Sequence, residues 1–139
     1  MESEKQNTEE EEQNQNLQAL KQFTGTEEYY SSSFRTLNLT SGIHYLRESL
    51  KCYWLIDIVE SIQYLKAIKD NKSFIIHQLK INPDSSGVFN SYSDYSEEDT
   101  DFNKQNLLYT QIIPYTDFKL KEGISFYQQG NVLLLKSEY

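Results

Sequence analysis

The spacing of apolar residues changes near position 70, and this change constrains the fold more than any other feature of the chain. Between Ile43 and Leu65 the apolar residues recur three or four positions apart, which is the period of an amphipathic helix. In residues 74–81 the side-chain pattern instead repeats at every second position, which is the period of a β-strand. Helices that precede strands in a chain of 139 residues are typical of a single α+β domain.

Two short helices are expected before position 40. Residues 17–23 carry apolar side chains three positions apart, which suits a short helix that the following glycine turn ends. Thr24 and Glu27 have the spacing of a capping box, so a second helix is predicted to begin there. Its buried stripe would contain Tyr30, Phe34 and Leu37.

Two longer helices follow, over residues 43–53 and 53–69. The apolar stripe of the second is rotated from that of the first, so we expect a bend near Lys51 and Cys52 rather than one straight helix. We expect the helix over 53–69 to cover one face of the sheet.

The strands predicted from alternation and turn residues cover residues 74–81, 88–92, 107–113, 124–128 and 132–136. Gly130 and Asn131 suit a two-residue type II′ turn between the last two strands. The predicted fold is therefore α+β, with N-terminal helices packed on one face of a four- to five-stranded antiparallel meander sheet.

Charge is concentrated in two segments of the chain. Residues 1–16 hold six Glu and one Lys, and residues 91–101 hold five acids and no base, a net charge of −5 in each. Because the whole chain carries −8, the remaining 112 residues carry about +2. We expect a disordered acidic tail over 1–16 and a single α+β domain over 17–139, with residues 91–106 forming an acidic hairpin loop.

Composition excludes several classes of protein. An acidic chain lacks the basic surface that direct binding to nucleic acid or to anionic membranes requires, so we expect a protein partner, with a basic surface favoured. Cys52 is the only cysteine and no Cys/His cluster accompanies it, so no disulfide, metal or cofactor is expected. The acidic start lacks the pattern of a signal peptide and no apolar run is long enough to span a membrane, which predicts a cytoplasmic protein.

Several short motifs in the chain resemble one known pattern. They are FTGTE at 23–27 followed by Tyr29 and Tyr30, YWL with Asp57 and Gln63, Asn82-Pro83, YTDF at 115–118, and NVLLL followed by Ser137, Glu138 and Tyr139. Together they resemble a family of small bacterial and phage proteins whose domain has no known function. The resemblance spans about residues 17–139 and implies one compact cytoplasmic domain, but it implies no activity.

The acidic hairpin loop holds the candidate partner-binding residues, which are Tyr92, Asp94, Tyr95, Glu97, Glu98, Asp99 and Asp101. Carboxylates beside aromatic rings would fit a basic groove in a nucleic-acid-binding protein, in place of phosphates and bases. The leading hypothesis is therefore a non-enzymatic protein-binding module, in its most specific form a phage or mobile-element inhibitor. A loop that serves only solubility is the alternative, and a calcium site is a third interpretation, although the EF-hand spacing is absent.

A small enzyme is the competing hypothesis. Asp57, Glu60 and Tyr64 share one edge of a predicted helix, and with His77 they would supply an acid/base site. The alternative is that the three form a solvated helix face while His77 is a neutral core histidine. The Cys52 thiol is expected to be buried and inert.

A structural homodimer is the remaining hypothesis. Residues 132–135 are all apolar, so both faces of the last strand need cover, and Tyr127 and Leu134 are expected to be cross-strand neighbours on the face away from the helices. Either loops of the same chain or a second copy would provide that cover.

Overall fold

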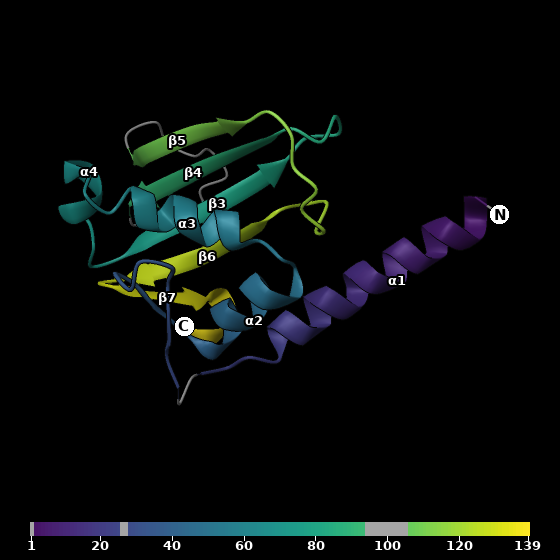
Figure 1. Ribbon diagram of the computed structural model, residues 1–139, viewed down its shortest axis with the longest axis horizontal. Coiled ribbons are helices and arrows are strands. Elements are labelled where there is room, and N and C mark those ends of the chain that lie inside the picture. Colours follow the sequence, from purple (N-terminus) through teal and green to yellow (C-terminus); the bar gives the residue numbers. More distant parts are fainter. Residues whose placement is uncertain (1, 26–27, 94–105) are drawn as a thin grey trace.

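A seven-stranded sheet forms the centre of the protein, in a computed structural model that describes residues 2–25, 28–93 and 106–139 (Figure 1). The strand order is β1-β2-β7-β6-β3-β4-β5. The strands are β1 (Tyr30–Ser31), β2 (Asn38–Leu39), β3 (Ile75–Ile81), β4 (Gly87–Ser93), β5 (Leu107–Ile113), β6 (Ile124–Gln129) and β7 (Val132–Leu135). The helices are α1 (Glu2–Lys21), α2 (Ser41–Ser49), α3 (Tyr53–Ser61) and α4 (Lys66–Lys69), and a short 3-10 helix, η1 (Lys136–Glu138), follows β7. The predicted α+β class is confirmed.

The sheet is larger than predicted and is not a simple meander. β6 pairs with β3 rather than with β5, and β2 runs parallel to β7, so the sheet is mixed. The physical reason lies in β3, where Ile75, Ile76, His77 and Leu79 are all buried. A strand that is buried on both faces is typical of the inside of a sheet, where it has a neighbour on each edge. The β6–β7 hairpin therefore pairs with the edge of β3 that β4 leaves open. The half-exposed β5 is left at the edge of the sheet.

The local strand and turn predictions hold. Gln129 pairs with Val132, so Gly130 and Asn131 form a two-residue turn. Gly130 has a φ of 61° while Asn131 is not among the residues with positive φ, as a type II′ turn requires. Tyr127 lies opposite Leu134, as predicted.

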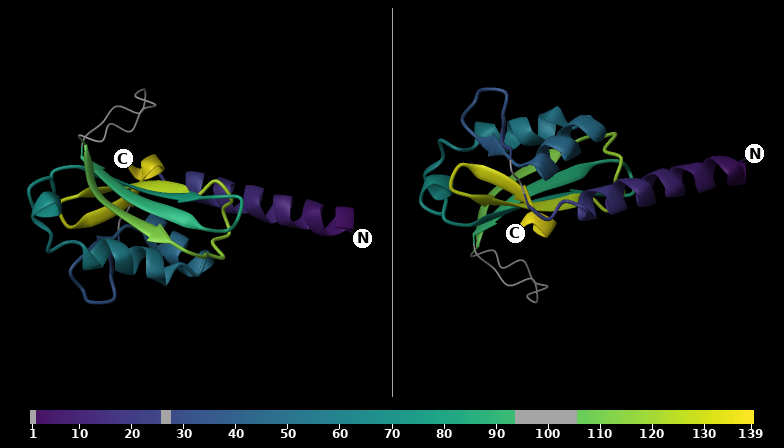
Figure 2. Two further views of the ribbon diagram at one scale, coloured as in Figure 1. Left: turned by 90° about the horizontal axis from the view of Figure 1, so that it is seen from above. Right: turned by 90° about the horizontal axis from the view of Figure 1, so that it is seen from below.

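Helices α2 and α3 lie on one face of the sheet (Figure 2). Leu55, Ile56 and Val59 of α3 pack in one core cluster with strand residues such as Phe89 and Phe126. The predicted bend is present, since Lys51 has a φ of 51° and α3 begins at Tyr53. α3 is shorter than the helix predicted over 53–69, because the chain becomes extended at Leu65 before α4 begins.

The helix predicted after Thr24 is wrong. Residues 28–39 form β1, a turn and β2, and Phe34, which was expected to be buried, is 80% exposed. The reason is not local, because the turn is held by hydrogen bonds to Glu60 on α3.

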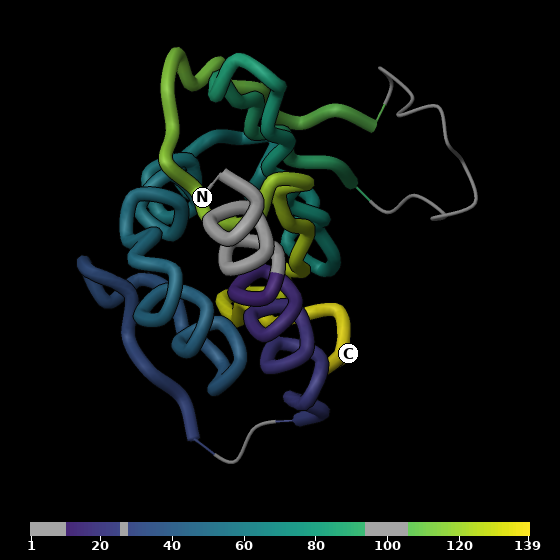
Figure 3. Tube along the Cα trace, turned by 90° about the vertical axis from the view of Figure 1, so that its right-hand side faces the viewer, coloured from purple at the N-terminus to yellow at the C-terminus, as the bar shows by residue number. Residues whose placement is uncertain are grey.

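The N-terminal segment contains the longest described helix. Residues 2–21 form α1, which projects from the body of the protein in Figure 1 and includes the short helix predicted from residue 17. Glu and Gln, which dominate this segment, favour helix almost as strongly as alanine. The C-terminal end of α1 meets the body, where Leu20 is buried and its carbonyl accepts a hydrogen bond from Ser137 Oγ (3.3 Å). Figure 3 shows the C-terminal residues beside this end of α1.

The face of the sheet opposite α2 and α3 carries a second, smaller cluster of buried residues. Its members are Ile76, Tyr92, Tyr127 and Leu134, with Phe74 packed against them. The ring of Tyr139 lies 5.5 Å from those of Phe74 and Tyr127, so the chain's own C-terminus covers the outer side of the β6–β7 hairpin. Among the described helices, none has the length and apolar character needed to cross a membrane.

Candidate functional site

The acidic connection between β4 and β5 contains most of the predicted partner-binding residues. Asp94, Tyr95, Glu97, Glu98, Asp99 and Asp101 lie outside the described residues. Tyr92 is described, and with 5% of its surface exposed it belongs to the second core cluster rather than to an open binding surface. The two strands that flank the connection pair antiparallel, as a hairpin requires.

Glu60 is buried on α3 and holds the turn between β1 and β2. Its carboxylate accepts hydrogen bonds from the hydroxyls of Ser32 and Thr36 and from the amides of Phe34 (2.9 Å) and Thr36 (3.2 Å). Burial alone would raise the pKa of Glu60, but these hydrogen bonds outweigh it and lower the pKa below its ordinary value. Glu60 is therefore a charged, fully satisfied anchor and not a proton donor.

The other members of the predicted acid/base site lie apart from Glu60. Asp57 accepts a hydrogen bond from Ser33 Oγ (2.8 Å), so it supports the same turn. Tyr64 is 72% exposed. His77 is fully buried on β3 and bonds to neither of these residues. The structure thus brings Asp57 and Glu60 to one turn and does not bring Tyr64 or His77 to it.

A buried polar network surrounds His77. Nδ1 of His77 lies 2.7 Å from Ser91 Oγ and Nε2 lies 2.8 Å from Gln128 Oε1. Because an amide oxygen only accepts, His77 donates from Nε2, and Nδ1 accepts from the serine hydroxyl. Gln63, in the turn that follows α3, donates to Gln128 Oε1 (3.0 Å) and accepts from Gln128 Nε2 (2.8 Å).

This network resembles a nucleophile and base but lacks the means to act as one. Burial lowers the pKa of His77 from 6.5 to about 4, although the hydrogen bond to Gln128 opposes the shift, so the imidazole is neutral at pH 7. The orienting group is the amide of Gln128, which lacks the negative charge that a carboxylate would place beside an imidazolium. Neither Ser91 nor His77 has any exposed surface through which a substrate would reach it. The network joins the turn after α3 to the sheet, which confirms the interpretation of His77 as a neutral core residue.

The remaining candidates for chemistry are structural. Cys52 is buried, and burial raises the pKa of its thiol to about 12, as expected for an inert cysteine. His44 and Glu48 have separate partners and do not form a site together. The ring of His44 stacks on that of Tyr30, with 3.7 Å between centroids, and Glu48 accepts a hydrogen bond from Tyr53. Within the described residues no group of three or more His, Cys, Asp or Glu side chains could hold a metal ion.

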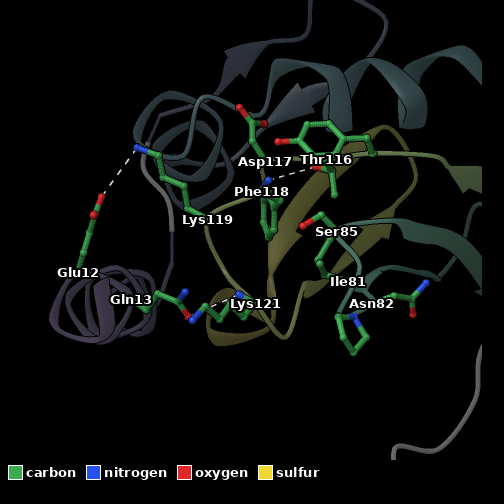
Figure 4. Close-up of a pocket in the computed structure, with 12 residues that line it drawn as sticks. Glu12, Gln13, Ile81, Asn82, Ser85, Thr116, Asp117, Phe118, Lys119 and Lys121 are labelled. Carbon is green, nitrogen blue, oxygen red and sulfur yellow. Dashed lines mark hydrogen bonds and ion pairs between the residues drawn. The ribbon is translucent and has the colours of Figure 1, made fainter. Parts of the chain in front are cut away.

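An open groove of about 680 Å³ lies between α1, the turn after β3 and the segment before β6 (Figure 4). Lys119 at its rim forms an ion pair with Glu12 (3.8 Å), and the amide of Lys121 donates to Gln13 Oε1 (3.5 Å). Asn82 and Pro83 of one quoted motif and residues 115–118 of another line it. None of the residues predicted for partner binding or catalysis lines this groove.

The C-terminal residues close the fold onto α2. The carboxylate of Glu138 accepts hydrogen bonds from Thr40 Oγ1 (2.6 Å), the Gly42 amide (3.2 Å) and the Leu135 amide (2.9 Å). A negative charge at the N-terminus of a helix is favourable, because the first amides there have no partner within the helix. Gly42 leaves room for this carboxylate, since a Cβ there would lie 2.7 Å from Cδ of Glu138.

A comparison with protein-family models decides the relationship that the motifs suggested. The model of a family of unknown function, DUF6876, matches residues 14–139. The chain belongs to this family. Neither the curated proteins nor the solved structures contain a match to it.

In this DUF6876 chain, several of the quoted motif residues have structural roles. Glu138 caps α2, and Tyr139 covers the second core cluster. Gln63 joins the buried network, while the ring of Trp54 meets that of Phe118 edge-on at 6.3 Å. These contacts stabilise the fold.

Sequence reasoning missed two features of this DUF6876 chain. The anchoring of the 32–36 turn by Glu60 has no local signal, because the two segments are 24 or more residues apart. The pairing of Gln63 with Gln128 had a partial signal, since Gln128 follows Ile124 and Phe126 on one face of a predicted strand. A polar residue at the end of an apolar face indicates a buried hydrogen-bond partner, but it does not identify the partner.

Proposed function

We propose that this DUF6876 protein is a non-enzymatic protein-binding module that engages a basic partner through the acidic connection between β4 and β5. One observation carries the proposal: five carboxylates and Tyr95 stand together between β4 and β5, in a chain whose other segments, apart from the N-terminal one, carry about +2. Opposite charge on a partner would both steer the encounter and select the partner.

The roles of the other titratable groups support this proposal. Glu60 anchors a turn, His77 lies sealed in a hydrogen-bond network, and the thiol of Cys52 is buried. A catalytic site needs such groups converging on a space that a substrate can enter. In the part of the chain that the structure describes, these three groups stabilise the fold instead, which favours binding over catalysis.

The chemistry of the acidic connection favours one class of partner. Carboxylates at close intervals reproduce the charge of a phosphate backbone, and the ring of Tyr95 offers the flat apolar surface that bases offer. The partner we propose is a nucleic-acid-binding protein whose basic groove the connection occupies. A phage or mobile-element inhibitor of a cytoplasmic host protein would act in this way.

Affinity capture with matched variants tests the proposal. One variant replaces the acids of the connection, Asp94, Glu97, Glu98, Asp99 and Asp101, by Asn or Gln. The control replaces four acids of α1, Glu9 to Glu12, by Gln, which removes a comparable charge elsewhere in the chain. Partners recovered with the wild type and the control at low salt are expected to be lost with the first variant, and added duplex DNA is expected to displace them. Equal recovery with all three proteins would refute the role of the connection.

A further inference from the structure

The two ends of the sheet are protected differently. At one end β1 has only two residues, and short edge strands offer little to a passing chain. At the other end β5 has seven residues and pairs with β4 along one side only (Figure 1). Within the described part of the chain, no strand pairs with its outer side. One long edge of the sheet is therefore open to another strand.

Over residues 109–113, β5 lacks the features that usually keep an edge strand from pairing. Residues 107–113 include no charged residue and no proline, although 24% of the chain is charged. The one irregularity in its pairing with β4 lies at Leu108, since Tyr109 pairs with Ser91 and Leu107 with Tyr92, and it leaves 109–113 regular. Ile112 is 75% exposed, and Tyr115, two residues beyond the end of β5, is 71% exposed. Natural edges are usually protected by lysine, proline or bulges, so this edge has the character of an interface.

We propose that β5 pairs antiparallel with β5 of a second copy of this chain, across a two-fold axis at Gln111. In this register Thr110 of each copy lies opposite Ile112 of the other, and Tyr109 lies opposite Ile113. The faces match, because Tyr109, Gln111 and Ile113 pair with the helix-side residues of β4 while Thr110 and Ile112 pair with those of the opposite face.

The side chains of β5 suit pairing with an identical strand. Aromatic and β-branched residues facing one another across strands are favourable pairs, and the two-fold axis repeats the pair of Tyr109 and Ile113. The Tyr109 hydroxyl donates to Gln111 Oε1 (2.8 Å), which leaves the amide nitrogen of Gln111 as a donor for the same residue of the other copy. Main-chain hydrogen bonds supply most of the affinity in this mode of association.

Charge favours an antiparallel pair of identical strands over a parallel one. With the axis at Gln111, the two Leu107 residues are eight residue steps apart along the strands, or about 27 Å. That separation is about three times the screening length at physiological salt, so the acidic segments that precede the strands do not repel each other strongly. A parallel pair would set the two segments side by side. The dimer would present both acidic segments, which would give a partner two sites of attachment.

Light scattering after size-exclusion chromatography tests the proposal over a range of concentrations. The wild type is expected to move from the 16.4 kDa monomer to twice that mass as concentration rises. Two double variants at the same sites test the register. Thr110→Lys with Ile112→Lys places like charges opposite each other and is expected to raise the dissociation constant at least about tenfold. Thr110→Glu with Ile112→Lys places opposite charges there and is expected to keep the dimer.

The controls separate loss of pairing from loss of fold. Both substituted side chains are exposed, so circular dichroism is expected to show the native fold in both variants. Tyr64→Lys changes an exposed aromatic residue elsewhere and is expected to leave the dimer intact. A wild type that stays monomeric, or equal dimerisation of the two double variants, would overturn the proposal. The substitutions lie outside the acidic connection, so this result is independent of the capture experiment.

Discussion

Protonation of buried His77 predicts a loss of stability in weak acid. The pKa of His77 is about 4 in the folded protein, because burial penalises the charged imidazolium, and returns to about 6.5 when the chain unfolds. Between these values the unfolded chain binds a proton that the folded chain does not. The contribution to the free energy of unfolding is therefore complete above pH 6.5 and declines as the pH falls toward 4.

The size of this effect follows from the shift. A difference of about 2.5 pKa units corresponds to a limit of about 3.4 kcal/mol, and a change from about pH 7.5 to about pH 5 realises about 2 kcal/mol of it. Glu60 and Asp84 contribute little over this range, because hydrogen bonds lower the pKa of each carboxyl below its ordinary value. The range also stays above the sequence pI of about 4.7, which helps to keep the protein soluble.

Urea unfolding at the two pH values measures the effect, with the fluorescence of Trp54, the only tryptophan, as the signal. His77→Gln removes the titrating group, so its free energy of unfolding should fall by much less than that of the wild type over the same range. His44→Gln changes the only other histidine, which is half-buried, and should retain the wild-type dependence. The reasoning would be refuted if the wild type were equally stable at both pH values, or if His44→Gln rather than His77→Gln abolished the dependence.

Three further predictions concern the anchors of the fold. Gly42→Ala should reduce the free energy of unfolding by about 1–2 kcal/mol in urea titrations, because the new Cβ would lie 2.6 Å from Leu135 Cδ1 and crowd the capping carboxylate, whereas Gly25→Ala, with no atom within 4 Å, should have no such effect. Glu60→Gln should cost about 2–3 kcal/mol and speed amide hydrogen exchange in residues 32–36, since an amide NH₂ would face hydrogen-bond donors; unchanged exchange there would contradict the anchoring role. The Cys52 thiol should react with a thiol reagent at neutral pH only as fast as the protein opens, so immediate labelling of the native protein would contradict its burial.

Local patterns in the sequence predicted much of the C-terminal half. The strand over residues 107–113 has the predicted bounds, because its side chains alternate and Pro114 ends it. The turn at Gly130 and Asn131 depends on backbone preferences that are local to those two residues. The bend between α2 and α3 was visible as a rotation of the apolar stripe between neighbouring segments. In each case the signal and the structure lie within a few residues of each other.

Predictions that depended on distant partners failed or were incomplete. The segment after Thr24 has the apolar spacing of a helix, yet it forms a turn that Glu60 holds. The hydrogen bonds to Glu60 stabilise this turn by more free energy than a marginal short helix would gain. The β6–β7 hairpin pairs with β3 rather than with β5, because β3 is buried on both faces and so lies inside the sheet, whereas β5 is half-exposed. The candidate catalytic residues were separated because Asp57 and Glu60 both support one turn, whereas Tyr64 is exposed and His77 lies in the core.

The sequence by itself therefore determined the class of the fold, most strand positions and the concentration of acid between two strands, since all of these are properties of neighbouring residues. The tertiary structure alone decided the order of the strands, the burial of His77 in a network with Gln63 and Gln128, and the exposure of β5 at the edge of the sheet. These features join residues far apart in the chain, and their energies depend on which groups are removed from water together. The local pattern of a sequence indicates that such partners are needed, but it does not identify them.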